Sequence, residues 1–285
     1  MIPAAFDYIR ATSLDQAIAL LQGDLDGNKL VAGGHTLIPT LKLRLATPSK
    51  LIDIGRIEEL KGIAVGETIR IGALTRHAEL LTSEELHAVL PIFRQAANVI
   101  ADPQVRNRGT IGGSLANADP SADWPAVVVA LGATLELAGP NGRRLVAAKD
   151  FFLDIFTTAL APGEIIVAIH IPRPKPGSQF RYRKIRHPAS GYAVVGVAVA
   201  MRLEDGVVTD AGIGVTGACS HALPAEAAAR ALVGNRLSPD HITRAATLAL
   251  QGVTCLSDQY ASAEYREHLV RTEFARALQS LAGER

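Results

Sequence analysis

The stretch Arg106-Asn107-Arg108-Gly109-Thr110-Ile111-Gly112-Gly113-Ser114-Leu115-Ala116-Asn117 places glycines, hydroxyls and amides between two apolar segments. Glycine allows the backbone to turn with positive φ and allows a ligand to approach the main chain closely. Consecutive exposed N–H groups in such a turn form a concave anion site, and Ser and Thr add hydroxyl donors with little bulk. The stretch therefore predicts a loop that binds phosphate.

A second stretch of the same character lies upstream, at Val31-Ala32-Gly33-Gly34-His35-Thr36. Two such loops suit a ligand with two phosphates, and we hypothesise that they hold one pyrophosphate together. Each loop alone is also consistent with an ordinary tight turn, because Gly-Gly is a common loop dipeptide. Neither loop is a P-loop or a Rossmann G-x-G-x-x-G motif. The pair of loops, with its flanking residues, favours the pyrophosphate hypothesis.

Composition limits the class of protein. The chain has 285 residues, of which 48% are hydrophobic, and a net charge of +1. It can build two modest domains or one large one, and it has no global field to attract nucleic acid or acidic lipid. Cys219 and Cys255 alone cannot bind an iron–sulfur cluster or zinc. No signal peptide is visible and no run approaches ~18 apolar residues, which predicts a soluble cytoplasmic protein without a membrane span.

Several motifs together resemble a known family. They are Ala32–Thr36, Leu51–Ile54, Asp102–Ser114, Asp119-Pro120 and Asp123. In this order and spacing they resemble the FAD-binding medium subunit of molybdenum hydroxylases, the family of carbon monoxide dehydrogenase and xanthine dehydrogenase. The resemblance spans essentially the whole chain. It is specific for FAD binding and much less specific for substrate.

His35 has two interpretations. In the family that the chain resembles, FAD is bound non-covalently, and His35 would then shape the loop by hydrogen bonding. In more distant FAD proteins of this general fold, a histidine in a similar Gly-Gly-His setting is bonded covalently to the flavin. The resemblance favours non-covalent FAD.

The resemblance also implies contacts outside the loops. Asp123 would accept hydrogen bonds from ribose or ribityl hydroxyls, although it also suits the N-cap of the apolar helix that follows. Lys184 would lie near the flavin ring and stabilise the reduced, anionic form, or it is a solvated strand lysine. Ile100, Ile166 and Tyr192 would pack on the flavin or adenine, or serve only in core and hairpin packing. The candidate FAD-binding residues are Ala32, Gly33, Gly34, His35, Thr36, Ile100, Thr110, Ile111, Gly112, Gly113, Ser114, Asp123, Ile166, Lys184 and Tyr192.

Two arginines flank the second loop. Arg106 and Arg108 either complement the charge of a diphosphate or form an ordinary surface pair.

The pattern and the resemblance predict an α+β fold in two parts. Residues 1–177 form a two-lobed FAD-binding domain of the PCMH type, with lobes at about 1–55 and 56–177. Residues 178–285 form a small C-terminal domain of antiparallel sheet plus helices. The boundary is placed at Pro172–Gly177, which contains three prolines and a glycine without apolar periodicity.

Local patterns predict several elements. Hairpins are expected over Gly62–Leu74 and Tyr192–Val215 because apolar and polar residues alternate around a glycine turn. A helix is expected from Thr82 towards Ile100, with a kink or a break at Pro91.

The chain shows no Cys-rich cluster motif, no nucleophile elbow and no His/Glu metal spacing. We therefore predict no catalytic or metal-ligating residue, and the hard chemistry would belong to a bound cofactor. The resemblance implies a flavoprotein oxidoreductase subunit that passes electrons from molybdenum and [2Fe–2S] centres through FAD to NAD, a quinone or O₂. These centres would lie on a large and a small partner subunit, in a dimer of heterotrimers. The alternatives are a stand-alone flavin oxidase of the same broad fold and a non-redox nucleotide-binding module.

Overall fold

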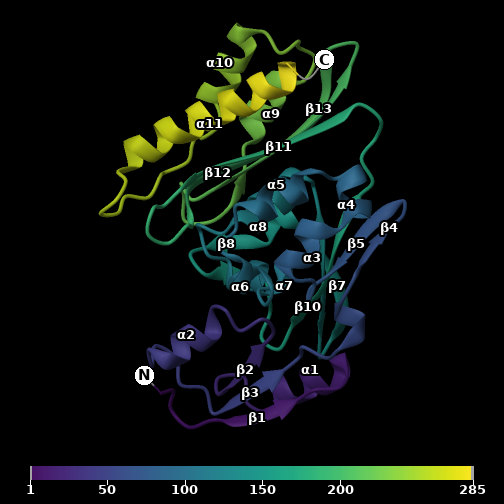
Figure 1. Cartoon of the computed structure of the whole chain (residues 1–285), viewed down its shortest axis with the longest axis vertical. Coiled ribbons are helices and arrows are strands. Elements are labelled where there is room, and N and C mark those ends of the chain that lie inside the picture. Colours follow the sequence, from purple (N-terminus) through teal and green to yellow (C-terminus); the bar gives the residue numbers. More distant parts are fainter. Residues whose placement is uncertain (1, 284–285) are drawn as a thin grey trace.

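The structure is a computed structural model that describes residues 2–283. The chain forms an elongated stack of three units, with the N-terminal unit at one end, a mixed unit in the centre and the C-terminal unit at the other end (Figure 1).

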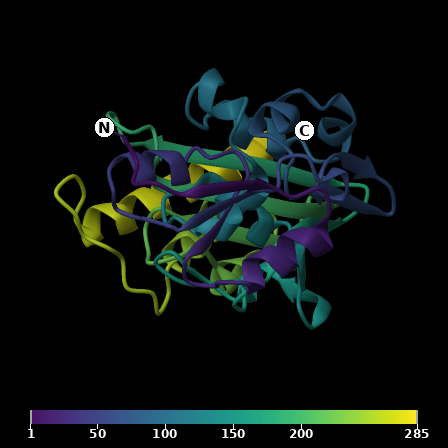
Figure 2. The same ribbon diagram turned by 90° about the horizontal axis from the view of Figure 1, so that it is seen from below.

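The first unit is a small parallel sheet with two helices. Its strand order is β1-β3-β2, and both pairings are parallel. Ser13 accepts a hydrogen bond from the Gln16 N–H and so caps the first helix. Figure 2 looks along the long axis onto this unit. The elements are β1 (Asp7–Arg10), α1 (Leu14–Gln22), β2 (Asn28–Val31), α2 (Leu37–Lys42) and β3 (Lys50–Asp53).

The central unit packs helices against an antiparallel sheet of order β4-β5-β10-β6-β7. Ile169 of the middle strand lies opposite Ile71 and Leu135, so apolar side chains line one face. The strands are β4 (Ile63–Val65), β5 (Thr68–Gly72), β6 (Thr134–Gly139), β7 (Gly142–Ala147) and β10 (Ile165–Pro172). The helices are α3 (His77–Thr82), α4 (Glu84–Val89), α5 (Ile92–Asn98), α6 (Pro103–Arg106), α7 (Ile111–Asn117) and α8 (Asp123–Ala130). Short elements complete the unit: η1 (Glu58–Leu60), η2 (Ala148–Asp150), β8 (Phe152–Asp154) and β9 (Thr157–Thr158).

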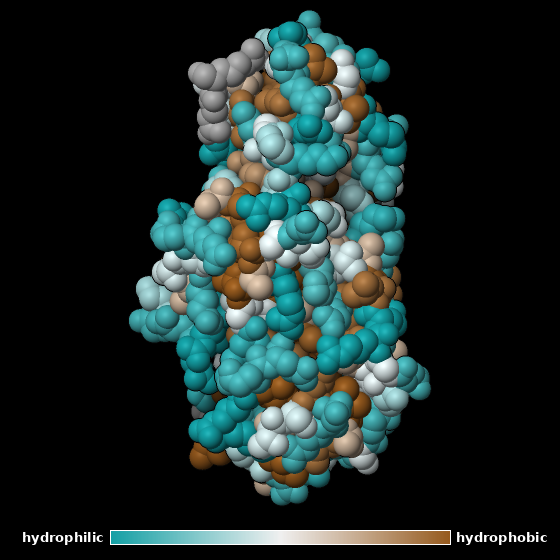
Figure 3. Space-filling model, turned by 90° about the vertical axis from the view of Figure 1, so that its right-hand side faces the viewer, coloured by the Kyte–Doolittle hydropathy of each residue, from teal (hydrophilic) through white to brown (hydrophobic). Residues whose placement is uncertain are grey.

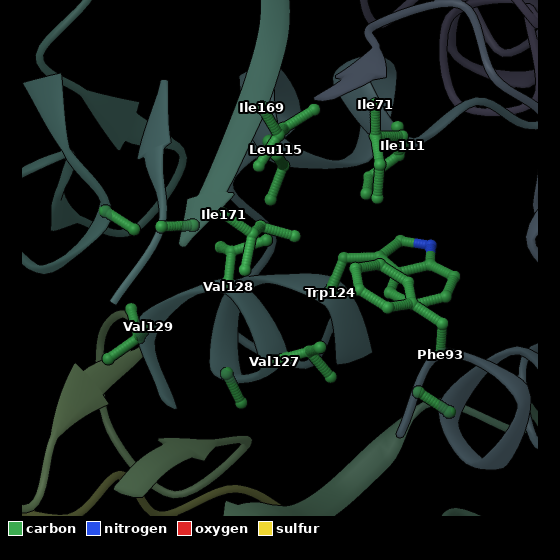
Figure 4. Close-up of a cluster of buried hydrophobic side chains, with 14 of the residues drawn as sticks. Ile71, Phe93, Ile111, Leu115, Trp124, Val127, Val128, Val129, Ile169 and Ile171 are labelled. Atoms are coloured by element: carbon green, nitrogen blue, oxygen red, sulfur yellow. The ribbon is translucent and has the colours of Figure 1, made fainter. Parts of the chain in front are cut away.

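The helix α8 forms the centre of the molecule. Every one of its residues is buried, as expected for a helix that is apolar all round. On one side Trp124 stacks on Phe93, and nearby Val128 lies beside Ile171 of the central sheet (Figure 4). On its other side α8 packs against β12 and β13 of the C-terminal unit. The two larger units therefore share a core.

The C-terminal unit is an antiparallel sheet of order β11-β12-β13-β14 with a long helix, α11, packed against it. The elements are β11 (Ser178–Arg186), β12 (Ala193–Glu204), β13 (Val207–Thr216), β14 (Leu223–Pro224), α9 (Glu226–Leu232), α10 (Pro239–Thr247) and α11 (Ala263–Gly283).

The structure confirms the α+β fold with an antiparallel C-terminal sheet. The two predicted hairpins are β4–β5 and β12–β13, and the predicted helix breaks at Pro91 into α4 and α5. The strand β1, which the sequence analysis did not anticipate, forms the edge of the first sheet. None of the helices within residues 2–283 combines the length and the hydrophobicity of a transmembrane span. Figure 3 shows polar side chains interspersed among apolar ones on one face.

Candidate functional site

The two glycine-rich loops touch each other through their main chains. The first follows β2, and the second precedes α7; Figure 1 shows the first loop extending from its unit towards α6 and α7. A Cβ atom at Gly33 would lie 2.2 Å from the Arg108 carbonyl oxygen and 2.9 Å from Gly109 Cα. Only glycine permits this approach. The structure thus brings together the two segments that the sequence analysis paired.

The first loop has free backbone donors. From residue 33 to residue 37, no backbone N–H donates a hydrogen bond to any of residues 2–283. The next N–H, that of Ile38, donates to the Gly34 carbonyl at 2.9 Å. The side chains of His35 and Thr36 are exposed, and Ala32 and Gly34 are half-buried. A run of free N–H groups on one turn is the arrangement that binds anions.

The second loop differs from the expectation. The Ile111 N–H donates to the Thr75 carbonyl at 3.0 Å, and the Gly112 N–H donates to the Ala73 carbonyl at 2.8 Å. The Gly113 N–H donates to Thr110 Oγ1 at 3.1 Å. The expectation of consecutive free N–H groups is therefore wrong for this loop, because the segment 73–75 runs beside it and accepts its hydrogen bonds. What the loop offers a ligand is an exposed Gly113 and the half-buried hydroxyl of Ser114.

The two flanking arginines have different surroundings. Arg106 Nη1 donates to the carbonyls of Ile100 and Ala101, at 2.7 and 3.0 Å. Its guanidinium therefore stabilises the turn after α5. The side chain of Arg108 is exposed, and no ion pair to it is found between residues 2 and 283. Ile100 is half-buried at this turn.

Asp123, Lys184 and Tyr182 form a buried polar cluster. Lys184 Nζ lies 2.8 Å from Asp123 Oδ2, and Tyr182 donates its hydroxyl to Asp123 Oδ1 at 2.5 Å. Both ionic side chains are almost fully buried, at 2% exposure for Lys184 and 6% for Asp123. Burial raises the pKa of the Asp123 carboxyl, while the ammonium and the phenol beside it act in the opposite direction. Burial and the same carboxylate raise the pKa of Tyr182.

This cluster excludes the alternative structural role that was considered for each of two residues. Asp123 is not an N-cap, because Ala122 holds that position of α8 and the carboxylate faces Lys184 instead. Lys184 is not a solvated strand lysine, since it also donates to the Val99 carbonyl at 3.2 Å.

The remaining candidates lie in different surroundings. Tyr192 is 46% exposed, and burial and then the charges of Asp119 and Asp123 raise its pKa. The next residue, Ala193, donates its backbone N–H to the Ser121 carbonyl at 3.1 Å. Ile166 is 5% exposed and packs in the central core. Its contacts are those of core packing.

The helix α7 links the loops to the Asp123 cluster. It begins at the second loop, and the turn that follows it leads to Asp123. At 1.5 Å per residue this helix spans roughly 10 Å. The candidate residues therefore follow an extended path, which suits an elongated dinucleotide.

The sequence analysis missed two residues that lie beside the candidates. Tyr182 lies two positions before Lys184 on β11, and strand alternation predicts that the two share a face. His77 lies beside Gly109, but its own segment carries no motif that indicates this. No group of three or more His, Cys, Asp or Glu that suits a metal ion occurs within residues 2–283.

Comparison with known proteins identifies the class. Residues 4–174 match the FAD binding domain in molybdopterin dehydrogenase, and residues 180–281 match the CO dehydrogenase flavoprotein C-terminal domain. The fold and the site thus define an FAD-binding oxidoreductase subunit. The chain belongs to the medium, FAD-binding subunits of the molybdenum hydroxylase family.

Individual relatives are similar over nearly the whole chain. The carbon monoxide dehydrogenase medium chain of Afipia carboxidovorans is 41% identical, covering 98% of this chain and 97% of the relative. The 6-hydroxypseudooxynicotine dehydrogenase complex subunit alpha of Paenarthrobacter nicotinovorans is 40% identical, covering 98% and 95%. The structure of reconstituted CO dehydrogenase from Oligotropha carboxidovorans matches with a TM-score of 0.96 and 41% identity, covering 100% of both chains.

The residues present fit FAD. The free N–H groups of the first loop suit the diphosphate, which carries negative charge and needs donors. The main-chain contact at Gly33 leaves no side chain between the loops.

Proposed function

We propose that this chain is the electron-transfer subunit of a molybdenum hydroxylase complex and that the two glycine-rich loops bind the diphosphate of its FAD. The single observation that carries the proposal is the run of free N–H groups at residues 33–37, in main-chain contact with the second loop. In this arrangement the first loop supplies the donors. The second loop supplies a rigid wall with the exposed Gly113 and the hydroxyl of Ser114.

The other candidate residues would hold the rest of the cofactor. The hydrogen bonds of Asp123 to Lys184 and Tyr182 fix the orientation of its carboxylate. Lys184 brings a buried cation to this end of the site, and a cation favours added negative charge nearby. Ile100 and Tyr192 would provide apolar and aromatic surface, and Ile166 would support it from the core. Bound flavin would supply the redox chemistry, since it accepts electrons singly or in pairs.

We attribute the partners to the same complex. The relatives are a medium chain and a complex subunit by name, which supports assembly of this chain with a molybdenum-containing large subunit and a [2Fe–2S] small subunit. A dimer of heterotrimers in the cytoplasm, passing electrons to NAD, a quinone or O₂, completes the proposal. The sequence identity of this chain to a carbon monoxide dehydrogenase subunit is nearly the same as its identity to a 6-hydroxypseudooxynicotine dehydrogenase subunit. This supports a role that does not depend on the substrate.

We also propose that the chain divides into an FAD-binding domain, 1–177, and a C-terminal domain, 178–285. Support comes from the segment 173–177, which joins β10 to β11 without helix or strand. The shared core around α8 holds the two domains together.

The test is the visible absorption spectrum of the purified chain with added FAD, repeated on the supernatant after acid precipitation. We expect flavin bands that move to the supernatant, because the binding is non-covalent. Bands that stay in the pellet would indicate a covalent bond at His35 and favour the flavin oxidase alternative. A chain that refuses FAD would contradict the proposal.

A matched variant tests the loops themselves. Gly113→Asp places a carboxylate beside the proposed diphosphate. The new Cβ would lie 2.9 Å from Thr110 Oγ1. We expect loss of FAD retention because like charges repel. Gly113→Asn is the control for the added side chain, and it should retain more FAD than Gly113→Asp. Unchanged FAD content in Gly113→Asp would contradict the two-loop site.

A further inference from the structure

His77 lies against the main chain of the second loop. It is the first residue of α3 and is 6% exposed. Its backbone N–H donates to the Gly109 carbonyl at 3.0 Å. A Cβ atom at Gly109 would lie 2.7 Å from His77 Nε2. The imidazole therefore lies beside the residue that also faces Gly33 of the first loop.

Trp124 determines which ring nitrogen carries the proton. Its Nε1–H donates to His77 Nδ1 at 3.0 Å. An indole N–H can only donate, so Nδ1 must accept, and in the neutral ring the proton is on Nε2. Burial, followed by the nearby charges of His35 and Arg106, lowers the pKa of His77 to about 4. The ring is thus neutral near pH 7 and carries a single donor.

The orientation of this ring is fixed. Trp124 is fully buried and stacks on Phe93 with ring centroids 5.5 Å apart. The indole cannot turn away without disrupting the core of the central unit. The direction of the Nε2–H bond is therefore set before any ligand arrives.

No hydrogen bond from His77 Nε2–H to an acceptor within residues 2–283 is found, and Nε2 is not one of the fully buried atoms that lack a partner, so this donor is open to solvent. A donor that is already held in one direction needs little reorganisation to bind a ligand that supplies an acceptor. The other groups at the loop junction that the structure offers to a ligand are also donors: the first-loop N–H groups and the hydroxyl of Ser114. An anionic oxygen is the acceptor that fits all of them.

We propose that His77 is a ligand-binding residue of the FAD site, which donates Nε2–H to an anionic oxygen of the diphosphate at the junction of the two loops. Trp124 is its positioning residue. This inference rests on the proposed function, which places the diphosphate at that junction. It adds a neutral histidine donor that neither glycine motif contains.

Two substitutions separate ligand binding from packing. In His77→Asn the amide oxygen can replace Nδ1 as the acceptor for Trp124, but no donor remains at the Nε2 position. In His77→Gln the amide nitrogen reaches the Nε2 position, but the acceptor for Trp124 is lost. A ligand-binding role requires Gln to be the better replacement, and a purely structural role requires Asn to be the better one.

The experiment measures dissociation constants of FAD and of ADP for the full-length chain without cofactor, by fluorescence quenching and calorimetry respectively. We expect His77→Asn to weaken both about 10- to 100-fold, the effect of a lost hydrogen bond to a charged group. We expect His77→Gln to stay within about threefold of the wild type, since the donor is kept. Equal weakening in both variants, or no weakening in His77→Asn, would overturn the inference. A wild-type chain that does not bind FAD would overturn the proposed function instead.

A second measurement needs no substitution. The imidazole ¹⁵N spectrum of the wild-type chain should show His77 protonated at Nε2, and the Nε2 resonance should shift when ADP is added. A proton on Nδ1, or an Nε2 resonance that ADP leaves unchanged, would overturn the inference even if the variants fail to fold.

Discussion

The two glycine-rich loops look alike in sequence and differ in their hydrogen bonds. The first loop leaves every N–H from residue 33 to residue 37 without an acceptor among residues 2–283. The second loop donates its N–H groups to the carbonyls of Ala73 and Thr75 and to Thr110 Oγ1. The difference comes from the neighbours, because residues 73–75 accept N–H groups of the second loop, whereas no carbonyl within residues 2–283 accepts those of the first. Glycine content indicates where a ligand can approach, whereas the surrounding chain decides which donors remain free.

The largest expected effect comes from separating the loops. In Gly33→Ala the new Cβ would overlap the Arg108 carbonyl oxygen at 2.2 Å, so the loops must move apart. We expect FAD to bind about 100-fold more weakly, as a backbone shift of this kind costs a few kcal/mol. FAD titration of the purified variant measures the loss.

Gly66→Ala is the matched control. Its Cβ would meet only the Thr68 carbonyl oxygen, at an ordinary 3.6 Å. FAD affinity in this variant should equal that of the wild type. An equal affinity in Gly33→Ala would mean that the contact between the loops has no role in binding.

A smaller expected effect is the pH dependence of stability that comes from His77, which lies beside the second loop. Its pKa is lowered to about 4 in the folded chain from 6.5, so between these values the unfolded chain binds a proton that the folded chain does not. Stability therefore falls as pH decreases from 6.5 to 4. The contribution of His77 is about 2 kcal/mol between pH 7 and pH 5.

Urea unfolding of the wild type and of His77→Asn at both pH values checks this. Between pH 7 and pH 5 the free energy of unfolding should fall by about 2 kcal/mol less in the variant than in the wild type. The difference between the proteins cancels the contributions of Asp119 and Asp123, whose raised pKa values act in the opposite direction. The same pH dependence in both proteins would contradict a buried neutral histidine beneath the loop.

The smallest expected effect compares a threonine from each loop. Thr110 caps α7 by accepting the Gly113 N–H, and Thr110→Val should lower the free energy of unfolding by about 1 kcal/mol. Thr36 precedes α2 without a side-chain cap bond, so Thr36→Val should change the free energy of unfolding by less than about 0.5 kcal/mol. Urea unfolding of the chain without FAD measures both. Equal losses would mean that the two loops do not differ as the hydrogen bonds indicate.

Much of the fold was predictable from the sequence. The β4–β5 and β12–β13 hairpins follow from alternation around glycine turns, and the break at Pro91 follows from the missing N–H of proline. The strand β1 was not predictable, because it is a short edge strand with half-buried or exposed residues throughout.

The site was predictable in its residue types and not in its bonding. The motifs indicated both loops, but their contact depends on the Arg108 carbonyl, far in sequence from Gly33. The second-loop N–H groups are hydrogen-bonded to the carbonyls of Ala73 and Thr75, which belong to no motif in the sequence. The ion pair of Lys184 with Asp123 joins residues 61 positions apart, and only the family resemblance placed them in one site.

The most direct test of the account is the ¹H–¹⁵N spectrum of the full-length chain as ADP is added. Free N–H groups that receive a phosphate change their chemical shifts strongly, whereas those already bonded within the protein change little. We predict large shifts at residues 33–37 and small ones at residues 111–114. Large shifts confined to residues 111–114, or none in either loop, would contradict the central claim that the first loop binds the diphosphate.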